Sequence, residues 1–202
     1  MKTIHLMMAL AMVVLAGCGE TPKQKESVKE PAVAPEPVTG QKAFHQMYLS
    51  ARAWAPDALG VEMTSVSLSN VKAEPGYAGA WQVTFTSPSK QRSKTFTYSV
   101  VDAPGNLRQG IFSGPESGAD PRAKAFPLAA LKIDSTAAYK TAAEKAAAYI
   151  KKNPDTPVNF LLEVNDRHHT VAWRVVFGNS ISTSDMSIFV DATTGTYLET
   201  RH

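Results

Sequence analysis

Three short patterns occur twice in this chain of 202 residues, in the same order each time. The matching pairs are Ala55-Pro56-Asp57 with Asn153-Pro154-Asp155, Ala80-Trp81-Gln82-Val83 with Ala172-Trp173-Arg174-Val175, and Val101-Asp102-Ala103 with Val190-Asp191-Ala192. Because the order is kept, the sequence predicts a structural unit that is present in two copies. This prediction limits the possible folds more than any other feature of the chain.

The second copy begins as a helix and continues as strands. Asp134 offers an N-cap side chain, no residue from Ala137 to Lys152 interrupts a helix, and Asn153-Pro154 ends it. After this segment the apolar period changes from 3.6 to 2, which is typical of strands with one buried face. The predicted strands cover residues 158–164, 171–177, 186–190 and 196–199.

The first copy shows the same order of elements. An apolar stripe from Ala43 to Trp54 predicts a helix that ends before Pro56. The strands expected after it cover residues 61–72, 80–87, 95–103 and 107–112. Residues 113–124 are rich in glycine and proline and are expected to form a flexible connection. Each copy therefore predicts an α+β unit, with one helix packed on a three- to four-stranded antiparallel sheet.

The end of the second copy resembles a known family. A strand with a Trp-Arg-Val run, followed by a strand that ends Val190-Asp191-Ala192-Thr193-Thr194-Gly195, is similar to the PepSY domain. The resemblance covers residues 135–200; over residues 41–112 the corresponding turn, Val101-Asp102-Ala103-Pro104-Gly105, lacks the threonines. It implies two tandem PepSY-like units, at 41–112 and 134–202, joined by a connection at 113–133.

The resemblance also suggests a role. PepSY domains occur in propeptides of thermolysin-type proteases, where they inhibit the protease and assist its folding, and in many cell-envelope proteins. It therefore implies a non-catalytic module of the cell envelope.

The N-terminus has the form of a secretion signal. An apolar run from Leu6 to Leu15 follows Lys2 and is too short to span a bilayer. It ends in Leu15-Ala16-Gly17-Cys18, which resembles the lipobox of bacterial lipoproteins. The resemblance implies cleavage after Gly17, removal of residues 1–17, and fatty acylation of Cys18 as a permanent membrane anchor. An ordinary signal peptide with a chance cysteine is the alternative.

The residue after the anchor bears on the location of the protein. Gly19 stands where aspartate would favour retention in the inner membrane. In a Gram-negative cell, the lipoprotein resemblance therefore implies the outer membrane, facing the periplasm. Residues 18–40 contain four prolines and several Lys and Glu residues but no aromatic residue. We expect them to form a disordered tether between the lipid anchor and the folded part.

Composition and motifs exclude several functions. The chain has 21 Lys and Arg against 18 Asp and Glu, a balance unlike that of a nucleic-acid-binding protein. The single cysteine excludes an intramolecular disulfide and a cysteine-based zinc site. The sequence has no serine-hydrolase elbow, no phosphate-binding glycine loop and no His-Glu-x-x-His motif. We therefore expect no enzyme activity, no catalytic residue and no cofactor.

The histidines are the remaining candidates for a metal site. His45, His168, His169 and His202 follow the signal segment. His168 and His169 are adjacent in an expected hairpin turn, and neighbouring side chains in a strand point to opposite faces. This favours solvated turn residues over a shared metal ion.

Other residues have a structural and a functional interpretation. Lys90, Arg92 and Lys94 lie at an expected hairpin tip, where they would keep the hairpin soluble or contact anionic lipid or an acidic partner. Asp102 and Asp191 suit turn-forming hydrogen bonds better than a functional pair. Trp81 and Trp173 are expected in the core rather than on a ligand platform.

These observations predict a membrane-tethered periplasmic binding module that recognises an envelope protein, with modulation of a protease as one role. An edge strand of the sheet could take up an extended peptide through backbone hydrogen bonds. The alternatives are an assembly accessory of an envelope complex, and a carrier of a small ligand or metal in a groove between the halves.

Overall fold

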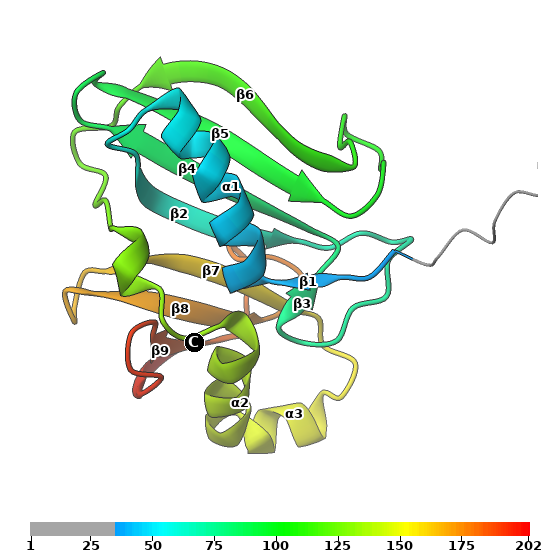
Figure 1. The fold of residues 1–202 in the computed structure, drawn as a ribbon. Helices are drawn as coiled ribbons and strands as arrows, with labels where there is room; N and C mark the ends of the chain where they lie inside the picture. The colour runs from blue at the N-terminus through cyan, green and yellow to red at the C-terminus, as the bar shows by residue number, and fades with distance from the viewer. Residues whose placement is uncertain (1–34) are drawn as a thin grey trace, which may run out of the picture. The chain divides into compact units, whose positions relative to one another are not determined.

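The computed structural model describes residues 35–202 as one compact unit. The signal segment, Cys18 and most of the expected tether lie outside the described residues. The described part contains an eight-stranded antiparallel sheet with helices packed against one of its faces (Figure 1). The expectation of an α+β fold built on antiparallel strands is confirmed.

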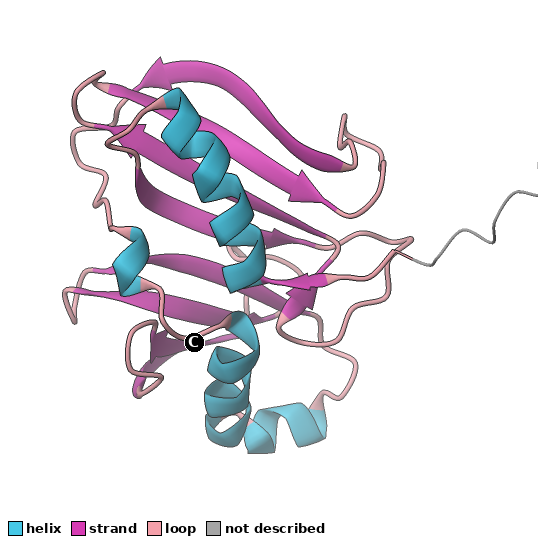
Figure 2. Cartoon of the chain, in the orientation of Figure 1, coloured by secondary structure: helices cyan, strands magenta, loops and turns pink. Residues whose placement is uncertain are grey.

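The elements follow one another in nearly the order expected from the sequence (Figure 2). The elements of the first half are β1 Val38–Thr39, α1 Gly40–Trp54, β2 Leu59–Val66, β3 Tyr77–Ala78, β4 Ala80–Ser87, β5 Arg92–Ser99 and β6 Gly110–Gly118. Those of the second half are η1 Leu128–Ala130, α2 Ser135–Lys145, α3 Ala147–Lys152, β7 Val158–Asn165, β8 Thr170–Phe177, β9 Met186–Asp191 and β10 Tyr197–Arg201.

The two halves share one sheet. Its strand order is β10-β9-β8-β7-β2-β4-β5-β6, so the first long strand of each half lies at the centre. Three residue pairs join β2 to β7: Glu62 with Glu163, Met63 with Leu162, and Thr64 with Leu161. We call this junction the seam. From it, each half adds three further strands outward in chain order.

Helix α1 packs on the first half. Thr39 caps it by accepting a hydrogen bond from the Lys42 backbone N–H. Its apolar stripe brings Phe44 and Met47, both fully buried, onto β4. The rings of Phe44 and Phe85 lie 5.4 Å apart. Helix α2 instead presents small residues, Ala138 and Ala142, which let it approach β8 and β9 closely.

The two repeated tryptophans occupy equivalent places. Trp81 on β4 donates its indole N–H to the Val38 carbonyl at 2.9 Å, and Trp173 on β8 donates to the Ile133 carbonyl at 2.8 Å. Each acceptor lies two residues before the first residue of a helix, α1 or α2. Both side chains are fully buried. The prediction that they belong to the core is confirmed.

The N-termini of α1 and α2 meet next to these rings. The Ser135 hydroxyl accepts a hydrogen bond from the Gly40 N–H at 2.8 Å and donates one to the Gly76 carbonyl at 2.6 Å. An Asp134 carboxylate oxygen accepts from the Gln41 N–H at 2.9 Å. The start of the second half therefore satisfies backbone donors in the first turn of α1, which otherwise lack partners.

Several expectations about individual elements are wrong. The strands expected over 61–72 and 95–103 end earlier, at Val66 and Ser99. The single helix expected over 137–152 is divided at Ala146, whose ψ of 10° departs from helical geometry. The break lets Tyr149 pack on Phe177, with ring centroids 6.0 Å apart, and donate to Asp185. Residues 113–118, expected in a flexible connection, belong to β6. An edge strand tolerates glycine and proline there because one side of it needs no ladder partner.

Candidate functional site

The seam opens at one end. Its ladder stops after Thr64 and Leu161, although both strands continue. Continued in the same register, Ser65 would face Phe160 and Ser67 would face Val158. Instead, the Ser65 hydroxyl accepts the Phe160 N–H at 2.9 Å. Among residues 35–202, no backbone hydrogen bond joins Ser67 or Leu68 to residues 156–160.

A cleft of about 300 Å³ occupies this open end. The first half contributes Ser65, Ser67, Leu68 and Val71 and the residues around β3, and the second half contributes Thr156, Pro157 and Val158. The volume is at the lower limit for ligand pockets, which suits a short segment or one or two side chains. We call it the seam cleft.

The walls of the seam cleft combine strand backbone with apolar side chains. Backbone groups alternate between the two sides of a strand. Because the Phe160 N–H points towards β2, the N–H and C=O of Val158 point the same way, into the cleft. Leu68 and Val71 supply an apolar floor, and Glu74 places a carboxylate at the exposed margin.

The other end of the seam is charged. Glu62 and Glu163 are directly opposite one another on the face without helices, where like charges destabilise a strand pair. Burial raises the pKa of Glu163, Arg174 lowers it and Glu62 raises it further, so the pKa lies above its ordinary value. Lys124 pairs with Asp166 at 2.7 Å beside them. A hollow of about 210 Å³ lies among these groups.

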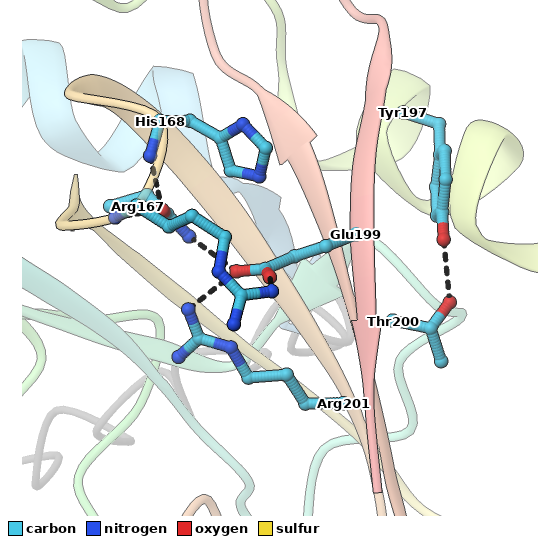
Figure 3. Close-up of polar contacts among 7 residues, drawn as sticks. Arg167, His168, Tyr197, Glu199, Thr200 and Arg201 are labelled. Atoms are coloured by element: carbon cyan, nitrogen blue, oxygen red, sulfur yellow. Dashed lines mark hydrogen bonds and ion pairs between the residues drawn. The ribbon is translucent and has the colours of Figure 1, made fainter.

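A second charged cluster holds the last strand. The carboxylate of Glu199 on β10 is nearly buried and accepts hydrogen bonds from Asn165 at 3.1 Å, from Arg167 at 2.6 Å and from Arg201 (Figure 3). Burial raises the pKa of Glu199, but Asn165 and Arg201 outweigh this, and the pKa lies below its ordinary value. The Arg201 guanidinium also covers the Phe189 ring at 4.3 Å. Because the Glu199 carboxylate finds its hydrogen-bond donors within the cluster, we interpret the cluster as one that fixes β10 against β7 and β9.

Both outer edges of the sheet carry features that discourage strand addition. In β6, Pro115 lacks a backbone donor, and the pairing with β5 shifts register between Lys94 and Phe96. In β10, the pairing with β9 shifts between Tyr197 and Glu199, and Glu199 turns its charge inward. The peptide-binding edge expected from the sequence is therefore poorly suited to that task at either outer strand.

The structure places the predicted histidines on the surface. His168 and His169 are both exposed in the turn between β7 and β8, and the His168 N–H donates to Asn165 at 3.0 Å. His45 and His202 are also exposed. Within residues 35–202, no group of three or more His, Cys, Asp or Glu side chains is arranged to hold a metal ion.

The basic hairpin rests on aromatic rings. The Lys90 ammonium lies 5.4 Å from the Trp54 ring and the Lys94 ammonium 5.7 Å from the Phe96 ring, while Arg92 is exposed. Two of the three cations thus have local partners on the same molecule.

The two repeated aspartates form turns in separate halves. Asp191 accepts hydrogen bonds from the N–H groups of Thr193 and Thr194, both at 2.8 Å, as expected for a turn. Asp102 accepts from the Gln109 N–H at 2.8 Å. Strands β8, β7, β2 and β4 lie between β9 and β5, so the structure does not bring these two aspartates together.

Sequence reasoning proposed a groove between the halves but assigned no residues to it. One local signal marks it: serines occupy alternate positions, 65 and 67, where β2 ends. A serine hydroxyl can replace a backbone partner and so weaken a ladder at that point.

Comparison with known proteins supplies a fold but no family. No family model matches the chain, and no curated protein matches its sequence. Among solved structures, the fold is similar to that of CD1622 from Clostridium difficile 630, described as a putative lipoprotein. The TM-score is 0.52 at 11% identity, over 79% of this chain and 91% of that chain. None of the helices described here is long and apolar enough to cross a membrane.

Proposed function

We propose that the protein is a lipid-anchored, non-catalytic module of the cell envelope that binds another protein. The lipobox-like residues Leu15-Ala16-Gly17-Cys18 support the anchor. The fold similarity to CD1622 of Clostridium difficile, described as a putative lipoprotein, is consistent with it. In a Gram-negative cell the module would face the periplasm from the outer membrane.

We also propose that the chain contains two PepSY-like units, residues 41–112 and 134–202, joined by residues 113–133. The equivalent positions of Trp81 and Trp173, each bonded to a carbonyl two residues before a helix, support a duplicated origin. Modulation of a protease is then one role of such a module. The alternative is an assembly accessory of an envelope complex.

The seam cleft carries the binding proposal. It combines strand backbone directed towards the gap with an apolar floor, which is the chemistry that recognises an extended segment of protein. The test is chemical crosslinking in intact cells, followed by mass spectrometry of the purified full chain. A single envelope protein recovered in fixed proportion supports the proposal. Recovery of lipid and of no protein contradicts it.

The anchor has its own test. Cys18→Ser removes the acylated side chain, so the protein should leave the membrane fraction, since stable attachment depends on two or more acyl chains. Thr21→Ser, three residues further along, is a matched control and should stay with the membrane. Unchanged fractionation of Cys18→Ser would rule out lipidation at this residue.

Protease modulation is tested separately. The full chain should slow peptide hydrolysis by a periplasmic metalloprotease in a concentration-dependent way. No effect across a panel of envelope proteases would exclude that role and leave partner binding in place.

A further inference from the structure

The seam cleft is a break inside a sheet rather than an outer edge. Strands β2 and β7 are each paired on their far sides, with β4 and β8, through the same residues that fail to pair with each other. Ser65 pairs with Trp81 on one side, and Phe160 pairs with Val175 on the other. The two walls are therefore held in place by their own halves while the gap between them remains open.

The break leaves strand hydrogen-bonding groups facing the gap. One donor, the Phe160 N–H, is satisfied by the Ser65 hydroxyl. The next residue with the same orientation, Val158, has its N–H and C=O directed to the cleft with no backbone partner across it among residues 35–202. An extended backbone can supply both partners, whereas an apolar small molecule cannot.

The side chains that line the cleft favour particular side chains in a bound segment. Leu68, Val71 and Val158 are apolar residues that line the cleft, and Glu74 is the charged residue in its lining. The cleft thus matches one apolar side chain next to a basic residue, since Glu74 favours a cation and the walls favour hydrocarbon.

We propose that the seam cleft binds an extended segment of the partner protein, with an apolar anchor residue followed or preceded by Lys or Arg. This inference rests on the proposed function and identifies where and how the partner is held. The protected outer strands β6 and β10 take no part in it. The segment completes the ladder between β2 and β7 at Val158 and places its anchor on Leu68 and Val71.

The test uses the full chain purified in detergent and a displayed library of random linear peptides. Peptides selected on the wild-type protein should share an apolar residue adjacent to Lys or Arg. Ser67→Trp fills the cleft from an exposed position outside the strands and should weaken their binding by about tenfold or more. Ser113→Trp, on exposed β6, is the matched control and should leave their affinity unchanged.

Hydrogen–deuterium exchange provides a second readout that does not depend on a variant. Bound peptide should slow exchange at the Val158 amide and leave the amides of β6 and β10 unchanged. Glu74→Gln should reduce the preference for Lys or Arg without loss of the apolar anchor.

Three results would overturn the inference. They are selection of no peptide, equal binding to wild type and Ser67→Trp, and protection of an outer strand in place of Val158. If intact-cell crosslinking still recovers a protein partner through another surface, the proposed function stands and only the cleft assignment fails.

Discussion

The indole rings of Trp81 and Trp173 pack edge to face at the centre of the molecule, with centroids 6.2 Å apart and an interplanar angle of 67°. Each ring belongs to a different half and each donates to the chain just before a helix of its own half. The pair therefore couples the two halves through the core, in addition to the three residue pairs of the seam. Substitutions near it should destabilise the whole described region rather than one half.

Gly40→Ala should lower the free energy of unfolding. An added Cβ would lie 2.6 Å from the Trp173 ring and 3.2 Å from the Trp81 ring, where the packed core leaves no room to move. Overpacking of this kind costs about 1–3 kcal/mol. Gly114→Ala is the control, because its Cβ would meet no atom closer than 4.0 Å. Urea unfolding of both variants measures the difference, and equal midpoints would contradict the packing described here.

Ser135→Ala should also destabilise the protein. The Ser135 hydroxyl is buried and joins the Gly40 N–H to the Gly76 carbonyl, so its removal leaves two backbone groups without partners. The expected cost is about 1–3 kcal/mol for each buried group left unsatisfied. Ser113→Ala, at an exposed site, should change stability by less than about 0.5 kcal/mol. Thermal unfolding by circular dichroism distinguishes the two.

Glu163→Gln should change the pH dependence of stability. Burial and Glu62 raise the pKa of Glu163 in the folded state above its unfolded value of 4.5. The folded state therefore favours the protonated Glu163 side chain. This contribution to stability is complete below pH 4.5 and is lost as the pH rises through the raised pKa. The Gln variant should be more stable than wild type at pH 7, with the difference disappearing near pH 4. Glu144→Gln, exposed on α2, is the control and should change stability by less than about 0.5 kcal/mol at either pH. A wild type that is more stable than Glu163→Gln at pH 7 would contradict the burial described here.

Asp57→Asn should have the opposite pH dependence. The Ser87 hydroxyl and the Ser89 N–H, both at 2.7 Å, lower the pKa of Asp57 to about 2 from 3.8. A lowered pKa stabilises the folded state above the unfolded value, and that contribution is lost as the pH falls from 3.8 towards 2. The Asn variant should be less stable than wild type at neutral pH and equal to it near pH 2. Parallel unfolding curves for the two proteins across this range would refute the contact.

The sequence predicted the elements of each half better than the contact that joins the two halves. Alternation in segments such as 171–177 follows directly from one buried sheet face, and the repeated tryptophans lie where a shared core requires them. The same alternation is compatible with two separate sheets or with one continuous sheet. Which of these forms depends on the contact between β2 and β7, and no local pattern encodes that contact.

The candidate site was harder to predict for a related reason. The seam cleft exists because a ladder stops, and at the stop the Ser65 hydroxyl accepts the Phe160 N–H from a position that looks like an ordinary strand end. The break at Ala146 is similar, because alanine favours a helix and the turn is accompanied by contacts of Tyr149 with Phe177 and Asp185. Tertiary contacts accompany both features.

Site-specific photocrosslinking in intact cells can show which surface holds the partner. A photoreactive residue at Ser67, in the seam cleft, is compared with the same residue at Ser113 on β6 and at Thr200 on β10. We expect Ser67 alone to capture a single envelope protein, at a segment that has an apolar side chain next to Lys or Arg. Capture of that protein from Ser113 or Thr200 but not from Ser67 would contradict this expectation.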